Sequence, residues 1–317
     1  MNKSSIIFIA GHTGMVGSSI VRQLNDCGFN NLICPSHKDL DLINQQAVIE
    51  FFKSTSPQYV FIAAGKVGGI HANNTYRGQF LYENLMIQNN LIHAAHETGV
   101  EKLLFLGSSC IYPKFSPQPM KEEYLLTGEL EQTNEPYAIA KISGIKMCEN
   151  YYRQYGDNFI SVMPTNLYGE NDNFDLQTSH VLPALIRKFH ESKVNNSEFV
   201  EVWGSGKPKR EFLYVDDVAN ACVFLLDKMD AHSLYDKMKI SHINIGSGID
   251  VTIAKLAEII RRIIGFGGEI KYDSSMPDGT PQKLLDISRI KSLGWEPSIS
   301  LEDGIKLAYD WFKQNVA

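Results

Sequence analysis

Short apolar runs alternate with amphipathic stretches along the first half of the chain. The apolar runs are continuously hydrophobic, as in strands that are buried on both faces of a sheet, and they cover residues 5–10, 31–34, 59–64, 102–109 and 159–169. Between them, apolar residues recur at helical spacing over residues 15–26, 44–55 and 84–99 and through the segment YAIAK. Alternating strands and helices are joined by right-handed crossovers. The pattern therefore predicts an α/β fold with a Rossmann-type, doubly wound parallel sheet.

The pattern loosens after about residue 170. The stretch EFVEVWGSGKPKREFLYVDD mixes short strands with turns, and helical spacing returns at residues 216–229, 252–264 and 301–314. We expect a dinucleotide-binding domain over residues 1–168, to which the chain returns near 211–246. The remaining residues, 169–317, should mainly form a second, smaller α/β domain that binds the substrate.

Composition and charge narrow the classes of function. The chain has 44% hydrophobic and 21% charged residues and a formal net charge of −6. This acidic balance argues against a nucleic-acid partner, which usually needs a basic face, and no apolar run reaches the roughly 20 residues of a membrane span. The cysteines are odd in number, scattered and outside any CxxC motif, which predicts neither disulfides nor a metal site: Cys27, Cys34, Cys110, Cys148 and Cys222. A cytoplasmic location is expected.

The motif GHTGMVG places Gly11, Gly14 and Gly17 between the first strand and the first helix. Small residues there allow a tight turn, close approach of a diphosphate to the backbone, and close packing of helix on strand, while the helix N-terminus faces the phosphates. The motif predicts dinucleotide binding, although glycines also occur in purely structural turns.

The end of the second strand bears on the choice of dinucleotide. Sites for NAD usually place an Asp or Glu there to hold the ribose 2′-hydroxyl, whereas this chain has Ser36, His37 and Lys38. A basic, hydroxyl-bearing loop suits a 2′-phosphate and predicts NADPH or NADP⁺. The alternative is a solvated loop that happens to carry a lysine.

Tyr137 and Lys141 lie four residues apart, so on a helix they share one face. Most such pairs are solvated and carry no chemistry, but this helix follows a strand that ends in GSSC, and the carboxyl ends of strands form the ligand crevice of a doubly wound sheet. We expect the ammonium of Lys141 to lower the pKa of the phenol. Tyr137 could then protonate a carbonyl oxygen while a hydride reaches the carbon, and Ser108 could hydrogen-bond the same oxygen.

These features together resemble the extended short-chain dehydrogenase/reductases. The similarity is closer to the members that epimerise and reduce GDP-4-keto-6-deoxy-D-mannose, and it spans almost the whole chain through the stretches AGHTGMVGS, AAGKVGGIHANN, LLFLGSSCIYP, TNEPYAIAKISGIK, VMPTNLYG, SHVLPALIRKFH, VWGSGKPKREFLYVDD and PDGTPQKLLD. The resemblance implies an NADPH-binding domain, a smaller GDP-sugar domain, a helix-based homodimer and a GDP-4-keto-6-deoxy sugar substrate. It implies epimerisation at C3 and C5 followed by reduction at C4.

The resemblance also implies roles for individual residues. Tyr137 is the expected acid of reduction with Lys141 as its partner, Ser108 contacts the carbonyl, and Cys110 and His180 are the expected base and acid of epimerisation. Expected cofactor contacts are Gly11, Thr13, Gly14, Met15, Val16, Gly17, Ser36, His37, Lys38, Ala63, Ala64, Leu106, Gly107, Lys141, Pro164, Thr165, Asn166, Leu167 and His180. Expected substrate contacts are Ser108, Cys110, Asn166, Lys188, Trp203, Arg210, Asp278 and Lys283.

The chain departs from the family pattern at three of these positions. Thr13 and His37 stand where relatives often carry arginines that meet the 2′-phosphate, and Lys188 replaces an arginine of some relatives. A lysine keeps the positive charge but loses bidentate binding of phosphate.

Several of the expected site residues also have a purely structural interpretation. Cys110 alone would be a small buried apolar side chain, His180 a capping or core histidine, Arg210 and Lys188 solvated cations, and Trp203 ordinary core. For the whole protein the alternatives are the same chemistry on a related GDP-4-keto sugar, such as a 3,6-dideoxy or heptose derivative, reduction alone, or a non-enzymatic NADP-binding protein. The intact set of catalytic residues argues against the non-enzymatic alternative.

Overall fold

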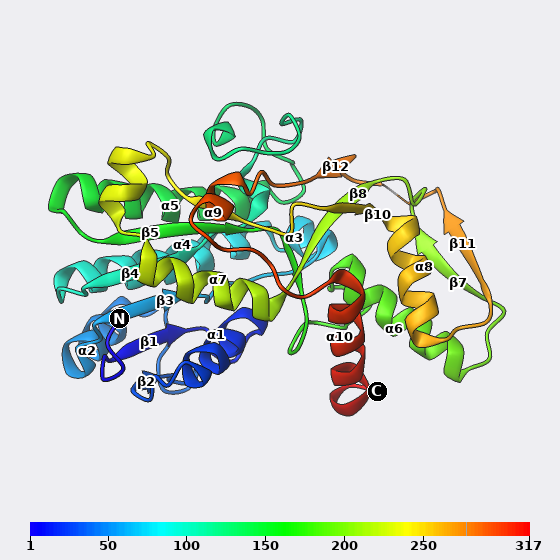
Figure 1. The fold of residues 1–317 in the computed structure, drawn as a ribbon, viewed down its shortest axis with the longest axis horizontal. Coiled ribbons are helices and arrows are strands. Elements are labelled where there is room, and N and C mark those ends of the chain that lie inside the picture. The colour runs from blue at the N-terminus through cyan, green and yellow to red at the C-terminus, as the bar shows by residue number, and fades with distance from the viewer. Residues whose placement is uncertain (277) are drawn as a thin grey trace.

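Six parallel strands form the central sheet, in the order β2-β1-β3-β4-β5-β9 (Figure 1). The computed structural model describes residues 1–276 and 278–317. The strands of this sheet are β1 (Ile7–Ala10), β2 (Leu32–Ile33), β3 (Tyr59–Ile62), β4 (Lys102–Leu106), β5 (Phe159–Pro164) and β9 (Ile243–Ile245). The strand order reverses between β1 and β3, because β1 pairs with both β2 and β3. Such a switch point opens a crevice at the carboxyl ends of the strands.

Helices cover both faces of this sheet (Figure 1). On one face α1 (Met15–Asp26) packs along α7 (Val215–Lys228), and on the other α4 (Arg77–Glu97) packs against α2 (Gln45–Thr55) and α5 (Glu135–Tyr155). The short helix α3 (Ile70–Thr75) precedes α4. The predicted doubly wound α/β fold is confirmed.

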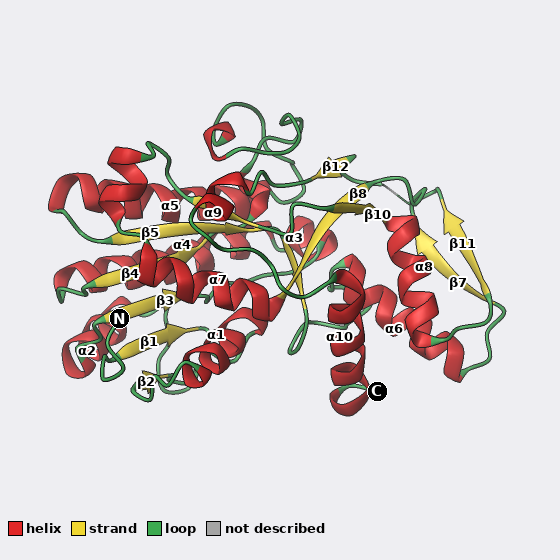
Figure 2. Ribbon diagram, viewed as in Figure 1, coloured by secondary structure: helices red, strands yellow, loops and turns green. Residues whose placement is uncertain are grey.

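A second group of smaller sheets lies at the other end of the molecule (Figure 2). Strand β8 (Lys209–Tyr214) is its centre and pairs with β6 (Asn166–Tyr168), β10 (Asp250–Thr252) and β12 (Gln282–Lys283), while β7 (Phe199–Trp203) pairs in parallel with β11 (Glu269–Asp273). The helices of this region are α6 (Val181–Val194), α8 (Ile253–Ile264) and α10 (Leu301–Asn315), whereas the short helix α9 (Ser288–Ser292) packs against β9 of the central sheet (Figure 1). Single turns complete the description: η1 (Ser109–Ile111), η2 (Glu122–Tyr124) and η3 (Ser233–Lys237).

Local sequence explains where several helices begin and end. Asn44, Thr252 and Ser300 each accept a hydrogen bond from a backbone N–H in the first turn of α2, α8 and α10, as N-cap residues do. Gly156 and Gly265 end α5 and α8 in the left-handed conformation, which glycine adopts without a steric penalty.

One predicted strand is wrong. Residues 159–169 were expected to form a single strand, but β5 ends at Pro164 in the central sheet and β6 begins at Asn166 beside β8. The N–H of Thr165, between them, donates to the Ile245 oxygen of β9 at 3.0 Å. The break carries the chain from one sheet to the other, so Asn166 and Leu167 lie where the two regions meet.

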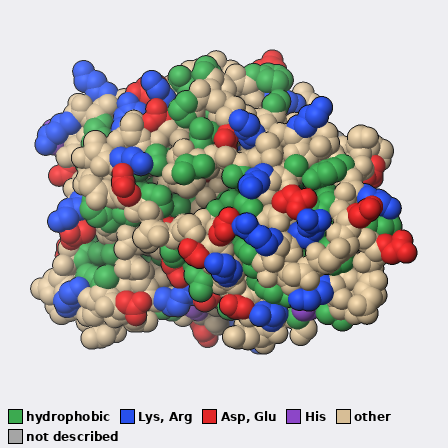
Figure 3. All heavy atoms as spheres, turned by 45° about the vertical axis from the view of Figure 1, so that its right-hand side comes forward, with side chains coloured by type: hydrophobic (Ala, Val, Ile, Leu, Met, Phe, Trp, Pro, Cys, Tyr) green, Lys and Arg blue, Asp and Glu red, His purple; other side chains and the backbone are tan. Residues whose placement is uncertain are grey.

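The described surface shows no dominant charge on the side seen in Figure 3, where acidic and basic side chains are interspersed. Among the residues that the structure describes, no helix is long and apolar enough to cross a membrane. Within the same residues, no group of three or more His, Cys, Asp or Glu side chains is placed to hold a metal ion.

Candidate active site

The glycine turn after β1 leaves no room for side chains at two of its positions. Gly11 has φ +87°, and a Cβ there would lie 2.7 Å from the Ala64 Cα. A Cβ on Gly17 would lie 2.0 Å from the Gly11 carbonyl oxygen. Gly14 is the N-cap of α1 and makes no side-chain cap, so N–H groups of the first turn are available to a ligand. This bare backbone at a helix N-terminus fits the diphosphate of a dinucleotide.

The other predicted cofactor residues follow the carboxyl ends of neighbouring strands. Thr13, Met15 and Val16 belong to the turn and the start of α1; Ala63 and Ala64 follow β3; Leu106 ends β4 and Gly107 follows it; and Pro164, Thr165, Asn166 and Leu167 run from β5 into β6. Gly107 is also confined, because a Cβ there would lie 2.4 Å from the Met163 Cε. The structure thus brings these residues to one edge of the sheet.

The loop after β2 carries Ser36, His37 and Lys38, of which His37 and Lys38 are exposed. The Ser36 hydroxyl donates to the Asp39 carboxylate at 2.6 Å, and the Ser36 N–H donates to the same oxygen at 3.2 Å. These hydrogen bonds hold the pKa of Asp39 below its usual range. The Asp39 carboxylate is thereby turned back onto Ser36.

Tyr137 and Lys141 are both buried on α5. The Lys141 amine donates to the Leu106 carbonyl oxygen at 2.9 Å and lies 5.8 Å from the centre of the Tyr137 ring. Burial raises the pKa of Tyr137 well above its ordinary value, the Cys110 charge adds to this, and the Ser108 hydroxyl opposes it. Burial lowers the pKa of Lys141 to about 8.

The expected effect of Lys141 on the phenol is therefore wrong. The prediction was a lowered pKa of Tyr137, but loss of water around a buried phenol disfavours the phenolate, and this cost exceeds any gain from the ammonium. Tyr137 consequently keeps its proton through neutral pH. A protonated phenol is the form that a proton donor needs, so a raised pKa is compatible with the predicted role of Tyr137 as the acid of reduction.

Ser108 and Cys110 stand at the end of β4, where Ser108 caps the single turn η1 and its hydroxyl accepts from the Cys110 N–H at 3.5 Å. Cys110 is buried in a small apolar cluster with Tyr137 and Phe80. Burial raises the pKa of its thiol, and the Ser108 hydrogen bond and the charges of Lys283 and Lys141 oppose that rise. One cluster thus holds a thiol and a phenol that come from different elements.

His180 is the N-cap residue of α6 and its side chain is accessible to solvent. The preceding residues are fixed against another loop, because the Gly69 N–H donates to the Thr178 oxygen at 2.8 Å. Atoms packed around the ring lower the pKa of His180 although part of the side chain reaches solvent, and the charge of Lys283 lowers it further. The same lysine therefore acts on both His180 and Cys110.

The predicted substrate contacts form a row that leads from the surface to the thiol. Its outer end is Trp203, which is 53% exposed, with the Lys188 amine 4.8 Å from its ring centre. The Lys188 amine also donates to the backbone carbonyl oxygen of Glu201 at 3.1 Å. The turn after Trp203 contacts Asp278, which accepts from the N–H of Ser205 at 2.7 Å.

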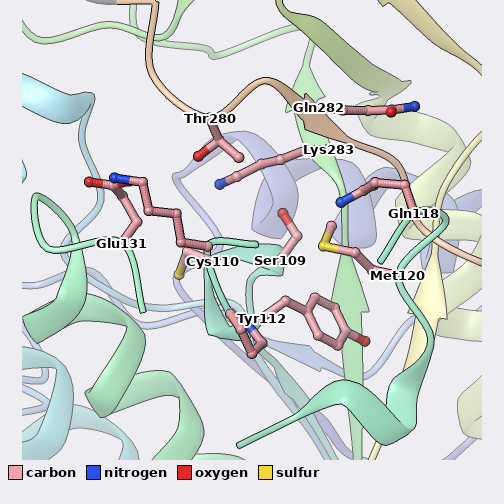
Figure 4. Close-up of a pocket in the computed structure, with 11 residues that line it drawn as sticks. Ser109, Cys110, Tyr112, Gln118, Met120, Glu131, Thr280, Gln282 and Lys283 are labelled. Carbon is pink, nitrogen blue, oxygen red and sulfur yellow. The ribbon is translucent and has the colours of Figure 1, made fainter. Parts of the chain in front are cut away.

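The inner end of the row is cationic. Arg210 on β8 is paired in register with Lys283 on β12. Burial lowers the pKa of Arg210, and the Asp278 charge opposes this. Lys283 lines a pocket together with Cys110 (Figure 4). A long anionic molecule with an aromatic head and a reactive tail could lie along such a row.

Asn166 and Glu211 connect the two regions behind this row. The Asn166 amide donates to the Glu211 backbone oxygen at 2.8 Å. The fully buried Glu211 carboxylate accepts from the N–H groups of Gly248 at 2.6 Å and Leu285 at 2.9 Å. Glu211 thereby holds the segment that follows Lys283, and sequence reasoning missed it. Its only signal was a charged residue inside the apolar run EFLYV.

Comparison with known proteins defines the class to which this chain belongs. Residues 7–246 match the NAD dependent epimerase/dehydratase family, and the chain is a member of that family. It is 57% identical over 316 residues to a putative GDP-L-fucose synthase 2 from Arabidopsis thaliana, covering 100% of this chain and 94% of the relative.

Two further similarities extend along the full length. A GDP-L-fucose synthase from Escherichia coli (strain K12) is 54% identical, with 98% of this chain and 97% of the relative covered. The solved structure of a GDP-mannoheptose C4 reductase from Campylobacter jejuni with NADP bound is 44% identical, has a TM-score of 0.92, and is matched over 99% of both chains.

Proposed function

We propose that this chain epimerises GDP-4-keto-6-deoxy-D-mannose at C3 and C5 and reduces C4 with NADPH, giving GDP-L-fucose. The observation that carries the proposal is the placement of Arg210 beside Lys283, and of Lys283 in the pocket of Cys110, which clusters with Tyr137. The full-length identity of 54–57% to GDP-L-fucose synthases supports the same activity.

Reduction uses the phenol as a proton donor. NADPH supplies a hydride for C4 of the sugar when it is bound. Tyr137, which keeps its proton because burial raises its pKa, donates that proton to the ketone oxygen, and the Ser108 hydroxyl hydrogen-bonds the same oxygen. Lys141 is fixed on the Leu106 oxygen, where its remaining N–H groups can hold the cofactor and restore the proton of Tyr137.

Epimerisation uses the thiol and the imidazole. The protons on C3 and C5 are both adjacent to the C4 ketone, so one base and one acid can act on both carbons in turn. The Cys110 thiolate removes a proton and leaves an enolate, and protonated His180 returns a proton to the opposite face of the carbon. The net result at each carbon is inversion without oxidation, and a proton passed from the thiol to the imidazole, directly or through solvent, restores the pair before the second carbon reacts.

The cofactor is NADPH, and a charge test addresses the loop that is proposed to select it. If Lys38 meets the 2′-phosphate, Lys38→Glu should lower kcat/KM for NADPH and narrow the gap to NADH. Lys53→Glu, at another exposed lysine, is the matched control and should leave the ratio of kcat/KM for NADPH to kcat/KM for NADH unchanged. If Lys38→Glu also left this ratio unchanged, Lys38 would not contact the 2′-phosphate.

A second candidate is reduction alone, or the same chemistry on a heptose or 3,6-dideoxy GDP-sugar. The 44% identity to a GDP-mannoheptose C4 reductase favours it. Reaction in D₂O separates the two activities, because epimerisation introduces deuterium beside the ketone and reduction alone does not. A panel of GDP-4-keto sugars compared by kcat/KM then identifies the sugar.

We further propose a homodimer formed by the outer faces of α4 and α5. These helices pack together and leave Tyr82 59% and Ile139 42% exposed. A double substitution of both residues to lysine should produce monomers in light scattering coupled to size exclusion. Val194→Lys, at another exposed apolar residue, should not. A wild-type monomer would overturn the proposal.

The free thiols of all five cysteines support a reducing compartment, and we propose the cytoplasm. Cell fractionation of the native protein tests this assignment. Recovery from an oxidising compartment would contradict it.

A further inference from the structure

Lys283 lines the pocket that also contains Cys110. Figure 4 shows its side chain reaching across this pocket from β12, with Thr280 beside it and Ser109 and Cys110 below it. The lysine is half-buried and Cys110 is buried. The amine is therefore held in a confined space that it shares with a thiol.

The amine of Lys283 forms no hydrogen bond and no ion pair with any residue of 1–276 or 278–317. The nearby carboxylate of Glu131 is already engaged, since it pairs with the Lys114 amine at 2.7 Å. Arg210, its partner across β8 and β12, carries the same charge and cannot neutralise it. A half-buried cation without a paired anion stabilises any negative charge that develops next to it.

We propose that Lys283 is the cation that stabilises the thiolate of Cys110, in addition to any contact it makes with the substrate. Lys283 is thus a positioning residue that acts through the thiol. Its role in epimerisation rests on the proposed function. Its effect on the thiol does not, because that effect exists in the free protein.

The charged groups around the thiol support this assignment. Cys110 is faced by Ser108 just before η1, by Tyr137 and Lys141 from α5, and by Lys283 from β12. Lys114 and Glu131 line the same pocket but neutralise each other as an ion pair. Both lysines lower the pKa of the thiol, and Lys283 contributes more than Lys141. Lys141 is also committed to the Leu106 oxygen.

The groups that act on Lys283 itself come from several elements. Burial and the charge of Arg210 lower its pKa, while the charges of Cys110 and Glu131 raise it. Lys283 in turn lowers the pKa of His180. One cation therefore shifts the base and the acid of epimerisation in the same direction.

The test measures how fast iodoacetamide alkylates Cys110 in the free protein, followed by mass spectrometry of the Cys110 peptide. Below the pKa of the thiol the rate follows the thiolate fraction. We expect Lys283→Met to lower the rate at pH 8 about tenfold and Lys283→Arg to retain most of the wild-type rate. Lys121→Met, which removes a charge from an exposed position, should react like the wild type.

An alkylation rate in Lys283→Met equal to that of the wild type, in a variant that still binds NADPH, would overturn the proposal. If Lys283→Met does not bind NADPH, the comparison is made between Lys283→Gln and Lys283→Arg. Equal alkylation rates in these two variants would also overturn the proposal. Because no sugar is present, the result is independent of the proposed activity.

A second readout concerns epimerisation. Loss of Lys283 raises the pKa of both Cys110 and His180, so both limbs of the pH profile for inverted product should move to higher pH. A lysine that only holds a phosphate would raise KM and leave the limbs in place.

Discussion

The sharpest structural prediction concerns Gly17, where the first helix meets the glycine turn. In Gly17→Ala the new Cβ would lie 2.0 Å from the Gly11 oxygen, 2.6 Å from the Gly11 carbonyl carbon and 2.9 Å from the His12 Cα. All three atoms belong to the backbone and none can rotate away. Ordinary contact needs about 3.5 Å, so α1 and the turn must separate by roughly an ångström and a half.

This separation has two measurable costs. Overpacking a confined site costs about 3 kcal/mol at the upper end of its usual range, and alanine regains about 1 kcal/mol of helix propensity. The free energy of unfolding should therefore fall by about 2 kcal/mol. Displaced N–H groups also lose charge-assisted hydrogen bonds to a phosphate, each worth about 1.5–3 kcal/mol, so the Kd for NADPH should rise about tenfold or more.

Urea unfolding and NADPH fluorescence titration measure these two quantities. The matched control is Gly267→Ala, at an exposed position between α8 and β11 where a Cβ would meet nothing within 4 Å. That variant should be as stable as the wild type or slightly more stable, with unchanged NADPH binding. Wild-type stability and affinity in Gly17→Ala would refute the close packing of helix and turn.

The remaining predictions concern the chemistry. Tyr137→Phe removes the proton donor and should lower NADPH oxidation by about 100-fold or more while NADPH still binds; near wild-type turnover would remove Tyr137 from the reaction. Cys110→Ser should still oxidise NADPH but lose deuterium exchange at C3 and C5, and wild-type exchange would place the base elsewhere. Arg210→Met removes a charged partner of the diphosphate, typically worth about 1.5–3 kcal/mol, so KM for the GDP-sugar should rise without a change in NADPH affinity; an unaltered KM would return Arg210 to the solvated surface. Inversion needs the Cys110 thiolate and protonated His180, and together these carry the same number of protons as the neutral pair. Burial raises the pKa of Cys110, while the atoms packed around His180 and the charge of Lys283 lower that of His180. Inverted product should therefore form at a constant rate through neutral pH, with the rate falling below the pKa of His180 and above that of Cys110; a narrow maximum near pH 7 would contradict this.

The fold was predictable where local sequence determines it. Helix α1 spans Met15–Asp26 as its apolar spacing predicts, and the glycines beside it are required by backbone contacts that the motif already indicates. Tyr137 and Lys141 share a helix face for the same reason. The break after Pro164 was not predictable, because it depends on pairing with strands β8 and β9, which lie far along the chain.

The electrostatics of the site could not be derived from sequence spacing. The raised pKa of Tyr137 follows from burial, and burial is a property of the folded chain. Lys283 acts on Cys110 and His180, although these three residues come from segments that are distant in sequence. Their approach depends on Glu211 and the sheet that it holds together.

The most direct test of the account is the reaction itself, carried out in D₂O with the wild-type protein, NADPH and GDP-4-keto-6-deoxy-D-mannose and followed by NMR. We expect GDP-L-fucose with deuterium at C3 and C5, formed in step with the oxidation of NADPH. A GDP-6-deoxy-D-hexose with protons retained at both carbons would contradict it and identify the chain as a reductase alone.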